Sequence, residues 1–213
     1  DQAEYLIITH PNFSGSANRL ANYHRNQFNR TVHVVNVNQI YNEFSSGMLD
    51  PTAIRDFIKM FYDRGMDNNT ELPRYVLLMG DGSYDYKNRV TQNLSNFIPT
   101  YQSRMSQRPT LSYTSDDYYG FLDDGEGFWG EGASREGLIY NIQFDAEGDT
   151  AVMQHGLDVA VGRIAANSIS EADGVVTKII NYLGDPESFG PWRNRVMLVA
   201  DHKDEDGQLH ISQ

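Results

Sequence analysis

Carboxylate side chains flank two predicted strands of this 213-residue sequence and fill the segment between them. Asp81 follows the apolar residues 75–80, Asp158 opens the β-prone residues 158–163, and residues 115–124 carry further aspartates. Carboxylates combined with loop carbonyls suit calcium, which takes roughly six to eight oxygen ligands in irregular geometry. The alternative is a solvated acidic surface, because the spacing of these carboxylates follows no regular metal-binding motif.

A serine nucleophile is a second candidate chemistry. Gly80-Asp81-Gly82-Ser83 resembles the Gly-Asp-Ser start of SGNH-type esterases, which would make Ser83 the nucleophile, but an ordinary strand-to-loop turn is the favoured interpretation. His10 also follows a predicted strand and could act as a base, although a structural role beside Pro11 is favoured. Glycine-rich nucleotide-binding motifs and the zinc-peptidase motif HExxH do not occur.

Composition excludes several classes of function. The sequence has 17 Lys and Arg against 29 Asp and Glu, a net charge of −12, and no cysteine. Binding to a nucleic-acid backbone is disfavoured, because that affinity comes from clustered basic side chains. Disulfides, cysteine-bound metals and a cysteine nucleophile are excluded within these residues. A hydrophobic content of 39% predicts a globular protein, and no apolar run is long enough to span a membrane.

The elements that must position these side chains alternate between strand and helix over the first 80 residues. Strands are predicted at residues 5–9, 31–37 and 73–81. A helix is predicted from Ser14 or Ser16, with its apolar or bulky face at Ala17, Leu20, Ala21, His24 and Phe28. A second is predicted to start at Asp50-Pro51, where Asp50 caps free N–H groups, and to end at Gly65. Short links between these elements predict an α/β fold with an open, mostly parallel, doubly wound sheet, a Rossmann-like three-layer sandwich.

Residues 82–156 interrupt this rhythm and are predicted to form a long, loop-rich insertion, with a β-prone run at 138–142. Regularity resumes at the strand 158–163, followed by a helix that Ser168 and Glu171 open as a capping box. A further strand is predicted at 196–200. These patterns predict a first α/β subdomain at 1–165, and a linking helix with the start of a second subdomain at 166–213.

Six segments in this order carry a family resemblance: YLIITHP (5–11), IYNEFSSG (40–47), DPTAIR (50–55), YVLLMGD (75–81), SDDYYG (115–120) and DVAVGR (158–163). Together they resemble the gingipain-like C25 cysteine peptidases, most of all the PorU-type sortases of the type IX secretion system. The resemblance spans nearly the whole chain. It implies a caspase-like and gingipain-like α/β catalytic domain in two subdomains, of which this chain supplies the first and the beginning of the second.

The resemblance also implies where the catalytic residues lie. The family's catalytic histidine stands between two glycines and precedes the cysteine nucleophile, and neither pattern occurs here. We therefore expect the catalytic residues beyond Gln213 and no peptidase activity from these residues alone. In the complete protein, a histidine-activated thiolate would attack a peptide carbonyl, and water or an acceptor amine would resolve the acyl-enzyme.

Calcium ligands follow from the same resemblance. The family's pattern maps onto this sequence as Asp81, Leu122, Asp123, Asp124 and Asp158. The acidic segment that ends the sequence resembles a family segment that contributes to metal binding and to the substrate S1 pocket, which implies a role for Asp204, Glu205 and Asp206. We therefore expect a structural calcium ion.

The resemblance predicts an extracytoplasmic protein, either secreted or on a bacterial outer-membrane surface. Its expected partners are a protein or peptide substrate, the remainder of its own catalytic domain and components of the secretion system. Neither nucleic acid nor a membrane span is expected for this segment. The alternatives are a non-enzymatic, calcium-stabilised adhesion or assembly domain and, less favoured, a serine hydrolase that uses Ser83.

Overall fold

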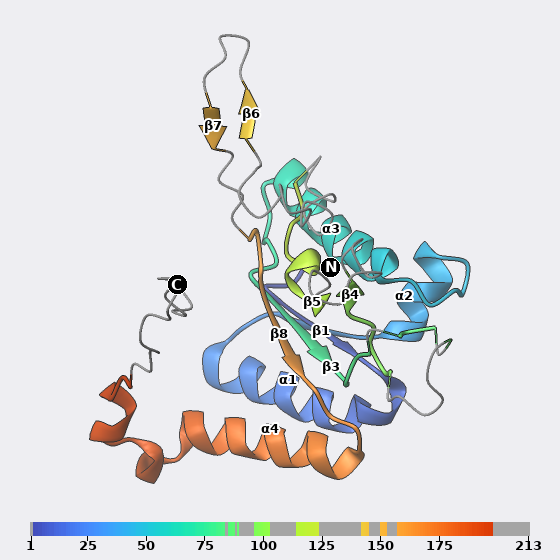
Figure 1. The fold of residues 1–213 in the computed structure, drawn as a ribbon. Helices are drawn as coiled ribbons and strands as arrows, with labels where there is room; N and C mark the ends of the chain where they lie inside the picture. The colour runs from blue at the N-terminus through green and yellow to red at the C-terminus, as the bar shows by residue number, and fades with distance from the viewer. Residues whose placement is uncertain are drawn as a thin grey trace, which may run out of the picture. The chain divides into compact units, whose positions relative to one another are not determined.

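Four parallel strands form the central sheet of the computed structural model, in the order β2-β1-β3-β8 (Figure 1). These strands are β1 (Tyr5–Thr9), β2 (Val32–Asn36), β3 (Tyr75–Met79) and β8 (Ala160–Ile164). In the register, Tyr5 of β1 lies between Val32 and Tyr75, and Tyr75 also pairs with Ala160. The predicted open parallel α/β sheet is therefore confirmed.

The structure describes residues 2–83, 85–87, 89, 96–102, 114–123, 142–144, 150–152 and 157–197. The chain divides into two compact units, Asp1–Thr177 and Lys178–Gln213, and each is described by itself. The predicted subdomain boundary at residue 166 stays a prediction. No helix within the described ranges combines the length and apolarity needed to cross a bilayer.

Helices cover both faces of the sheet. The α-helices of the described ranges are α1 (Ser14–Phe28), α2 (Val37–Phe44), α3 (Pro51–Asn68) and α4 (Ile169–Gly184). In Figure 1, α2 and α3 lie on one face, and α1 lies on the other. The first half of α4 joins α1, since Ser16 and Arg19 donate hydrogen bonds to Asp173, and Arg19 also donates to Thr177. From β1 the chain moves to β2 on one side, and it then crosses back over β1 to β3 on the other side. Right-handed crossovers in these opposite directions place α1 on one face of the sheet and α2 and α3 on the other.

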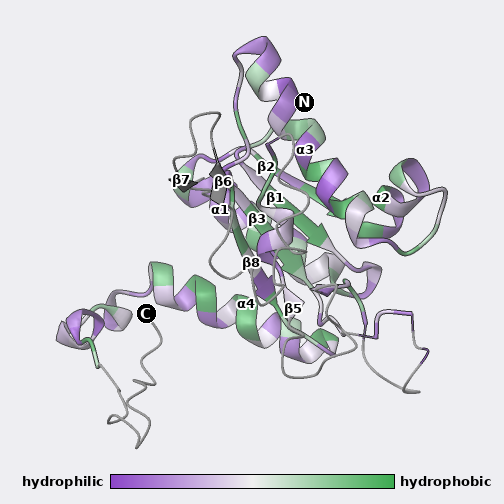
Figure 2. Ribbon diagram, turned by 45° about the horizontal axis from the view of Figure 1, so that its top comes forward, coloured by the Kyte–Doolittle hydropathy of each residue, from purple (hydrophilic) through white to green (hydrophobic). Residues whose placement is uncertain are grey.

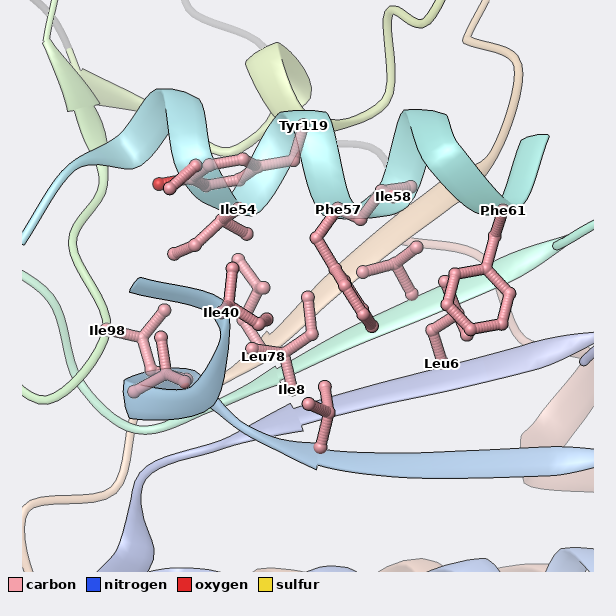
Figure 3. Packing of buried hydrophobic residues seen from close by; sticks show 14 of the residues in the cluster. Leu6, Ile8, Ile40, Ile54, Phe57, Ile58, Phe61, Leu78, Ile98 and Tyr119 are labelled. Atoms are coloured by element: carbon pink, nitrogen blue, oxygen red, sulfur yellow. The ribbon is translucent and has the colours of Figure 1, made fainter. Parts of the chain in front are cut away.

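The core lies between the sheet and the pair α2 and α3. Figure 3 shows Leu6, Ile8 and Leu78 of the strands facing Ile54, Phe57 and Ile58 of α3, with Ile40 of α2 beside them. Ile98 and Tyr119, from the segments that follow β3, complete the cluster. Figure 2 shows hydrophobic residues concentrated in the central strands and alternating with hydrophilic ones along α3 and α4. This alternation is typical of helices with one buried face.

Helix α3 starts as predicted and ends later than predicted. Asp50 accepts a hydrogen bond from the N–H of Thr52, and Pro51 occupies the first turn. The helix continues past Gly65 to Asn68, and Asn69 ends it in the left-handed conformation at φ 49°. Gly65 serves packing instead, because a Cβ there would lie 2.6 Å from a methyl carbon of Leu72 and 2.9 Å from the Glu71 carbonyl oxygen.

The Ser168 cap of α4 is confirmed, and α2 was not predicted. Ser168 accepts the N–H of Glu171, as in the predicted capping box, but the Glu171 carboxylate accepts the N–H of Asn167, one residue before Ser168. A complete capping box opens α2, where Asn36 and Gln39 cap each other's backbone. The sequence pattern missed α2 because the β-branched run of the preceding strand extends into its first residue, Val37.

Short elements occupy the described parts of the insertion. Strands β4 (Tyr101–Gln102) and β5 (Thr114–Ser115) form one antiparallel pair, and β6 (Ile142–Phe144) and β7 (Thr150–Val152) form another. The β-prone run predicted at 138–142 reaches β6 only at Ile142, and its other residues lie outside the described ranges. Of the strand predicted at 196–200, residues 196 and 197 adopt no strand, and the rest lies outside the described ranges.

Candidate functional site

Arg163 is the centre of the carboxyl edge of the sheet. It lies near the end of β8, where its guanidinium makes five hydrogen bonds, matching its five N–H donors. Two go to the Asp116 carboxylate at 2.7 and 2.8 Å, and the other three go to the carbonyls of Gly80, Ile98 and Pro99. The side chain therefore ties the end of β3 and two loop segments to β8.

Asp81, a predicted calcium ligand, lies at this carboxyl edge and is bonded within its own turn. Its Oδ1 accepts the N–H of Gly82 at 3.0 Å, and its carbonyl accepts the N–H groups of Phe97 and Ile98. Its own N–H donates to the Ala166 carbonyl. Gly80 before it has φ +144°, and a Cβ there would lie 2.7 Å from the Cβ of Phe97. These contacts make Gly80-Asp81 a tightly packed strand end.

Ser83 has the contacts of a turn residue. Its hydroxyl accepts the N–H of Asp85 at 3.1 Å, and its own N–H donates to Asn96 Oδ1. The side chain is buried. Such a serine-to-backbone bond stabilises a turn, whereas a nucleophile needs an adjacent base. The geometry therefore favours the structural interpretation of Ser83.

His10 caps the short helix η1 (Pro11–Phe13) at the end of β1. Its Nδ1 accepts the N–H of Asn12 at 3.3 Å, which requires an unprotonated Nδ1. Partial burial lowers the pKa of His10, and the ring packs edge-on against Phe97 with centroids 4.9 Å apart. These contacts favour the structural role over the role of a base.

A second group of predicted ligands meets at the amino end of β8. Asp158 Oδ2 accepts the N–H of Leu122 at 2.7 Å. The hydroxyl of Tyr62 lies 3.4 Å from Asp158 Oδ1 and 3.5 Å from Asp123 Oδ1. The Lys59 ammonium donates to the Leu122 carbonyl at 2.9 Å. We call Lys59, Tyr62, Leu122, Asp123 and Asp158 the acidic corner.

The Tyr62 hydroxyl is protonated at neutral pH, as tyrosine ordinarily is. Desolvation first, and then the negative charges of Asp158 and Asp123, raise its pKa further, to about 12. The hydroxyl carries one proton, so it donates to one of the two carboxylates at a time. Lys59 pairs in addition with Asp63 one turn later, at 3.0 Å, and its side chain is 23% exposed.

One polar face of α3 holds residues 118–123, which include the predicted calcium ligands Leu122 and Asp123. Thr52 Oγ1 lies 3.2 Å from the Tyr118 hydroxyl, Arg55 donates to the Phe121 carbonyl at 2.8 Å, and Lys59 donates to the Leu122 carbonyl. With Tyr62, these residues follow the three- and four-residue spacing of one helix face. We call Thr52, Arg55, Lys59 and Tyr62 the α3 polar stripe. It fixes residues 118–123 along the helix.

Among the described residues, the predicted calcium ligands do not all come together. Asp81 follows its strand and Asp158 precedes its strand, so they lie at opposite ends of adjacent parallel strands. Asp81 pairs with Ala166, eight residues beyond Asp158, which corresponds to more than about 20 Å along an extended chain. One ion cannot contact both.

The other predicted ligands, Asp124, Asp204, Glu205 and Asp206, lie outside the described residues. Within the part of the chain that the structure describes, no three His, Cys, Asp or Glu residues gather in a way that could hold a metal ion. At the acidic corner, the donors of Lys59 and Tyr62 point at the oxygens that a calcium ion would need. The described residues therefore do not fit calcium as they stand.

Comparison with known proteins identifies the family. The model of peptidase family C25 matches residues 1–213. This chain belongs to peptidase family C25. A search of curated proteins finds no match.

Two solved structures resemble this C25 chain. Dimeric latent PorU from Porphyromonas gingivalis is 31% identical, with a TM-score of 0.66, over 97% of this chain and 18% of that one. The complex of RgpB pro- and mature domains from the same organism is 16% identical, with a TM-score of 0.48, over 84% of this chain and 29% of that one. The C25 chain thus spans less than a fifth of the PorU chain. It is a cysteine-peptidase-related domain with the PorU-like α/β fold.

Sequence reasoning about this C25 domain missed the residues that organise both edges of the sheet. Arg163 and Asp116 lie inside two segments of the family resemblance, but Arg163 was given no role and Asp116 was counted only among the carboxylates that could suit calcium. A basic side chain within an apolar strand is a signal that could have identified Arg163, because a buried charge needs a partner. Lys59 and Tyr62 could have been found from the polar positions of α3, where only the apolar face was considered.

Proposed function

We propose that this chain is the amino-terminal, nucleophile-free part of the catalytic domain of a PorU-type cysteine endopeptidase or sortase. The observation that carries the proposal is the likeness to PorU, at 31% identity over 97% of this chain, together with the C25 family model. The absence of cysteine from these residues agrees with a nucleophile supplied by another part of the protein.

The proposed role of these residues is to support the active site. In open α/β sheets, ligands bind beyond the carboxyl ends of the strands, where Arg163 ties the loops that follow β3 to β8. Its bidentate pair with Asp116 is the kind of charge-assisted contact that holds a loop in one geometry. The chain would thus present one ordered edge to the remainder of its catalytic domain, which is its proposed partner.

The proposed location and substrates of the protein follow from the same likeness to PorU. A PorU-type protein would act outside the cytoplasm, secreted or at the bacterial surface, on protein or peptide substrates delivered by a secretion system. The proposed peptidase or sortase activity requires no metal ion, so the proposal does not depend on whether the protein binds the expected calcium.

Thiol dependence in the full-length protein tests the proposal. We expect peptide cleavage or transfer that iodoacetamide abolishes, no labelling of these residues by a fluorophosphonate probe, and no turnover by the 213-residue chain alone. The matched variant is Ser83→Ala, which should leave the thiol-dependent rate unchanged because Ser83 lies in a turn.

Three outcomes would contradict the proposal. Turnover that survives thiol alkylation but is lost in Ser83→Ala would establish the serine hydrolase. Turnover by the 213-residue chain alone would show that no outside nucleophile is needed. A folded full-length protein without any turnover, on a range of peptides, would favour the adhesion or assembly domain.

A further inference from the structure

We propose that the Lys59 ammonium is the resident cation of the acidic corner, so that this chain holds residues 118–123 in place without calcium. The inference concerns a position where the family resemblance predicts a metal ion. It does not depend on peptidase activity.

The first support is the bonding of the Leu122 carbonyl. This carbonyl is one of the predicted calcium ligands, and Lys59 Nζ lies 2.9 Å from its oxygen. A calcium ion at roughly 2.4 Å from the same oxygen would lie beside the ammonium, and the two cations would repel each other. Calcium could bind this carbonyl only after Lys59 had moved away.

The second support is the bonding of the two carboxylates. Asp158 Oδ2 accepts the N–H of Leu122 at 2.7 Å, so this oxygen already holds the loop backbone. The Tyr62 hydroxyl lies 3.4 Å from Oδ1 of Asp158 and 3.5 Å from Oδ1 of Asp123, and it can donate a hydrogen bond to either carboxylate. Hydrogen-bond donors thus point at the carboxylate oxygens that would otherwise coordinate a metal ion.

The third support is that α3 supplies two successive cationic contacts. Arg55 donates to the Phe121 carbonyl and Lys59 donates to the Leu122 carbonyl, each from one face of the same helix. The two carbonyls precede Asp123. Arg55 and Lys59 thus hold the backbone that a calcium ion would hold in a metal-bound loop. Because both are side chains of the protein, no dissociable ion is needed.

Hydrogen exchange of residues 118–123, measured by mass spectrometry on the full-length protein, provides a local test. Exchange is compared in millimolar calcium and in EGTA, so that metal sites elsewhere do not affect the readout. We expect protection of this segment in the unmodified protein to be the same in both solutions. In Lys59→Met, we expect exchange in EGTA to be at least about tenfold faster, and calcium to restore the protection.

Three further variants control the experiment. Lys59→Arg keeps a cationic donor and should behave like the unmodified protein. Arg64→Met removes one positive charge from an exposed position of the same helix and should create no calcium response. Lys59→Gln retains a neutral donor and serves as the second test if Lys59→Met does not fold.

The proposal is overturned if EGTA speeds exchange of residues 118–123 in the unmodified protein. It is also overturned if Lys59→Met and Lys59→Gln keep full protection in EGTA, because the ammonium would then not hold the segment. Calcium-independent protection that Lys59→Met loses and calcium restores supports it. Since the readout is local order, a failure here would leave the thiol-dependent activity of the full-length protein unaffected.

Discussion

Arg163 shows how one side chain can organise the carboxyl edge of this sheet. Its planar guanidinium reaches a carboxylate and three carbonyls at once, which a lysine ammonium cannot do. The side chains of Arg163 and Asp116 are only 12% and 26% exposed. Solvent therefore screens this pair less than an ordinary surface ion pair.

We expect Arg163→Lys to lower the free energy of unfolding by about 2–4 kcal/mol, because carbonyls and a carboxylate lose their donors in a mostly buried setting. Urea denaturation measures the change. The matched control is Arg74→Lys, whose pair with Glu4 at 3.7 Å involves an arginine side chain that is 69% exposed, and which should cost less than about 1 kcal/mol. Equal effects of the two changes would show that the Arg163 contacts contribute no special stability.

Helix α3 uses two faces for two purposes. Its apolar face packs against the sheet, while the α3 polar stripe holds residues 118–123. Near its end, the returning chain at Glu71 and Leu72 approaches so closely that Gly65 leaves no room for a Cβ. Backbone atoms of Glu71 form one side of this contact, and backbone yields less easily than a flexible side chain.

We expect Gly65→Ala to destabilise the protein by about 1–3 kcal/mol, because overpacking outweighs the better helix propensity of alanine. The matched control is Gly174→Ala in α4, where no atom of the described part of the chain lies within 4 Å of the added Cβ, and which should stabilise the protein by about 0.5–1 kcal/mol. Thermal and urea unfolding of both variants give the comparison. A stabilised Gly65→Ala would mean that the Glu71–Leu72 turn can move aside.

At the scale of the whole molecule, three histidines with lowered pKa values connect stability to pH. Burial lowers the pKa values of His10, His24 and His33, which lie on different elements, and Arg30 lowers that of His24 further. Below about pH 6.5, the ordinary pKa of histidine, these side chains bind protons in the unfolded chain but stay neutral in the folded chain. The free energy of unfolding should therefore fall as the pH decreases through that value, until the lowered folded-state pKa values are reached.

We expect His24→Phe to reduce this dependence. His24 is buried, its Nδ1 has no hydrogen-bond partner among the described residues, and its ring packs against Tyr5 and Phe28, so a phenyl ring keeps the contacts and removes the titration. Urea denaturation at about pH 7 and about pH 5 measures the loss for each protein. An unchanged difference between the two pH values would exclude His24 as a contributor.

The sequence predicted the four strands of the central sheet, their parallel arrangement, and three of the four helices found in the described residues, because their signals are local. Alternation of strands and helices, the Asp50-Pro51 start of α3 and the Ser168 cap of α4 all act within a few residues. The sequence also contained a signal that the predicted set of calcium ligands did not take into account. Asp81 follows its strand and Asp158 precedes its strand, so a parallel sheet already implies that they lie at opposite edges.

The sequence by itself thus determined the fold class, the C25 resemblance and the absence of a cysteine nucleophile from these residues. Only the tertiary structure decided which groups meet: Lys59 with Leu122, 63 residues apart, and Arg163 with Asp116, 47 residues apart. Helix and strand signals depend on near neighbours, whereas the charge and hydrogen bonding at a site depend on side chains that only the completed packing of sheet, helices and loops brings together.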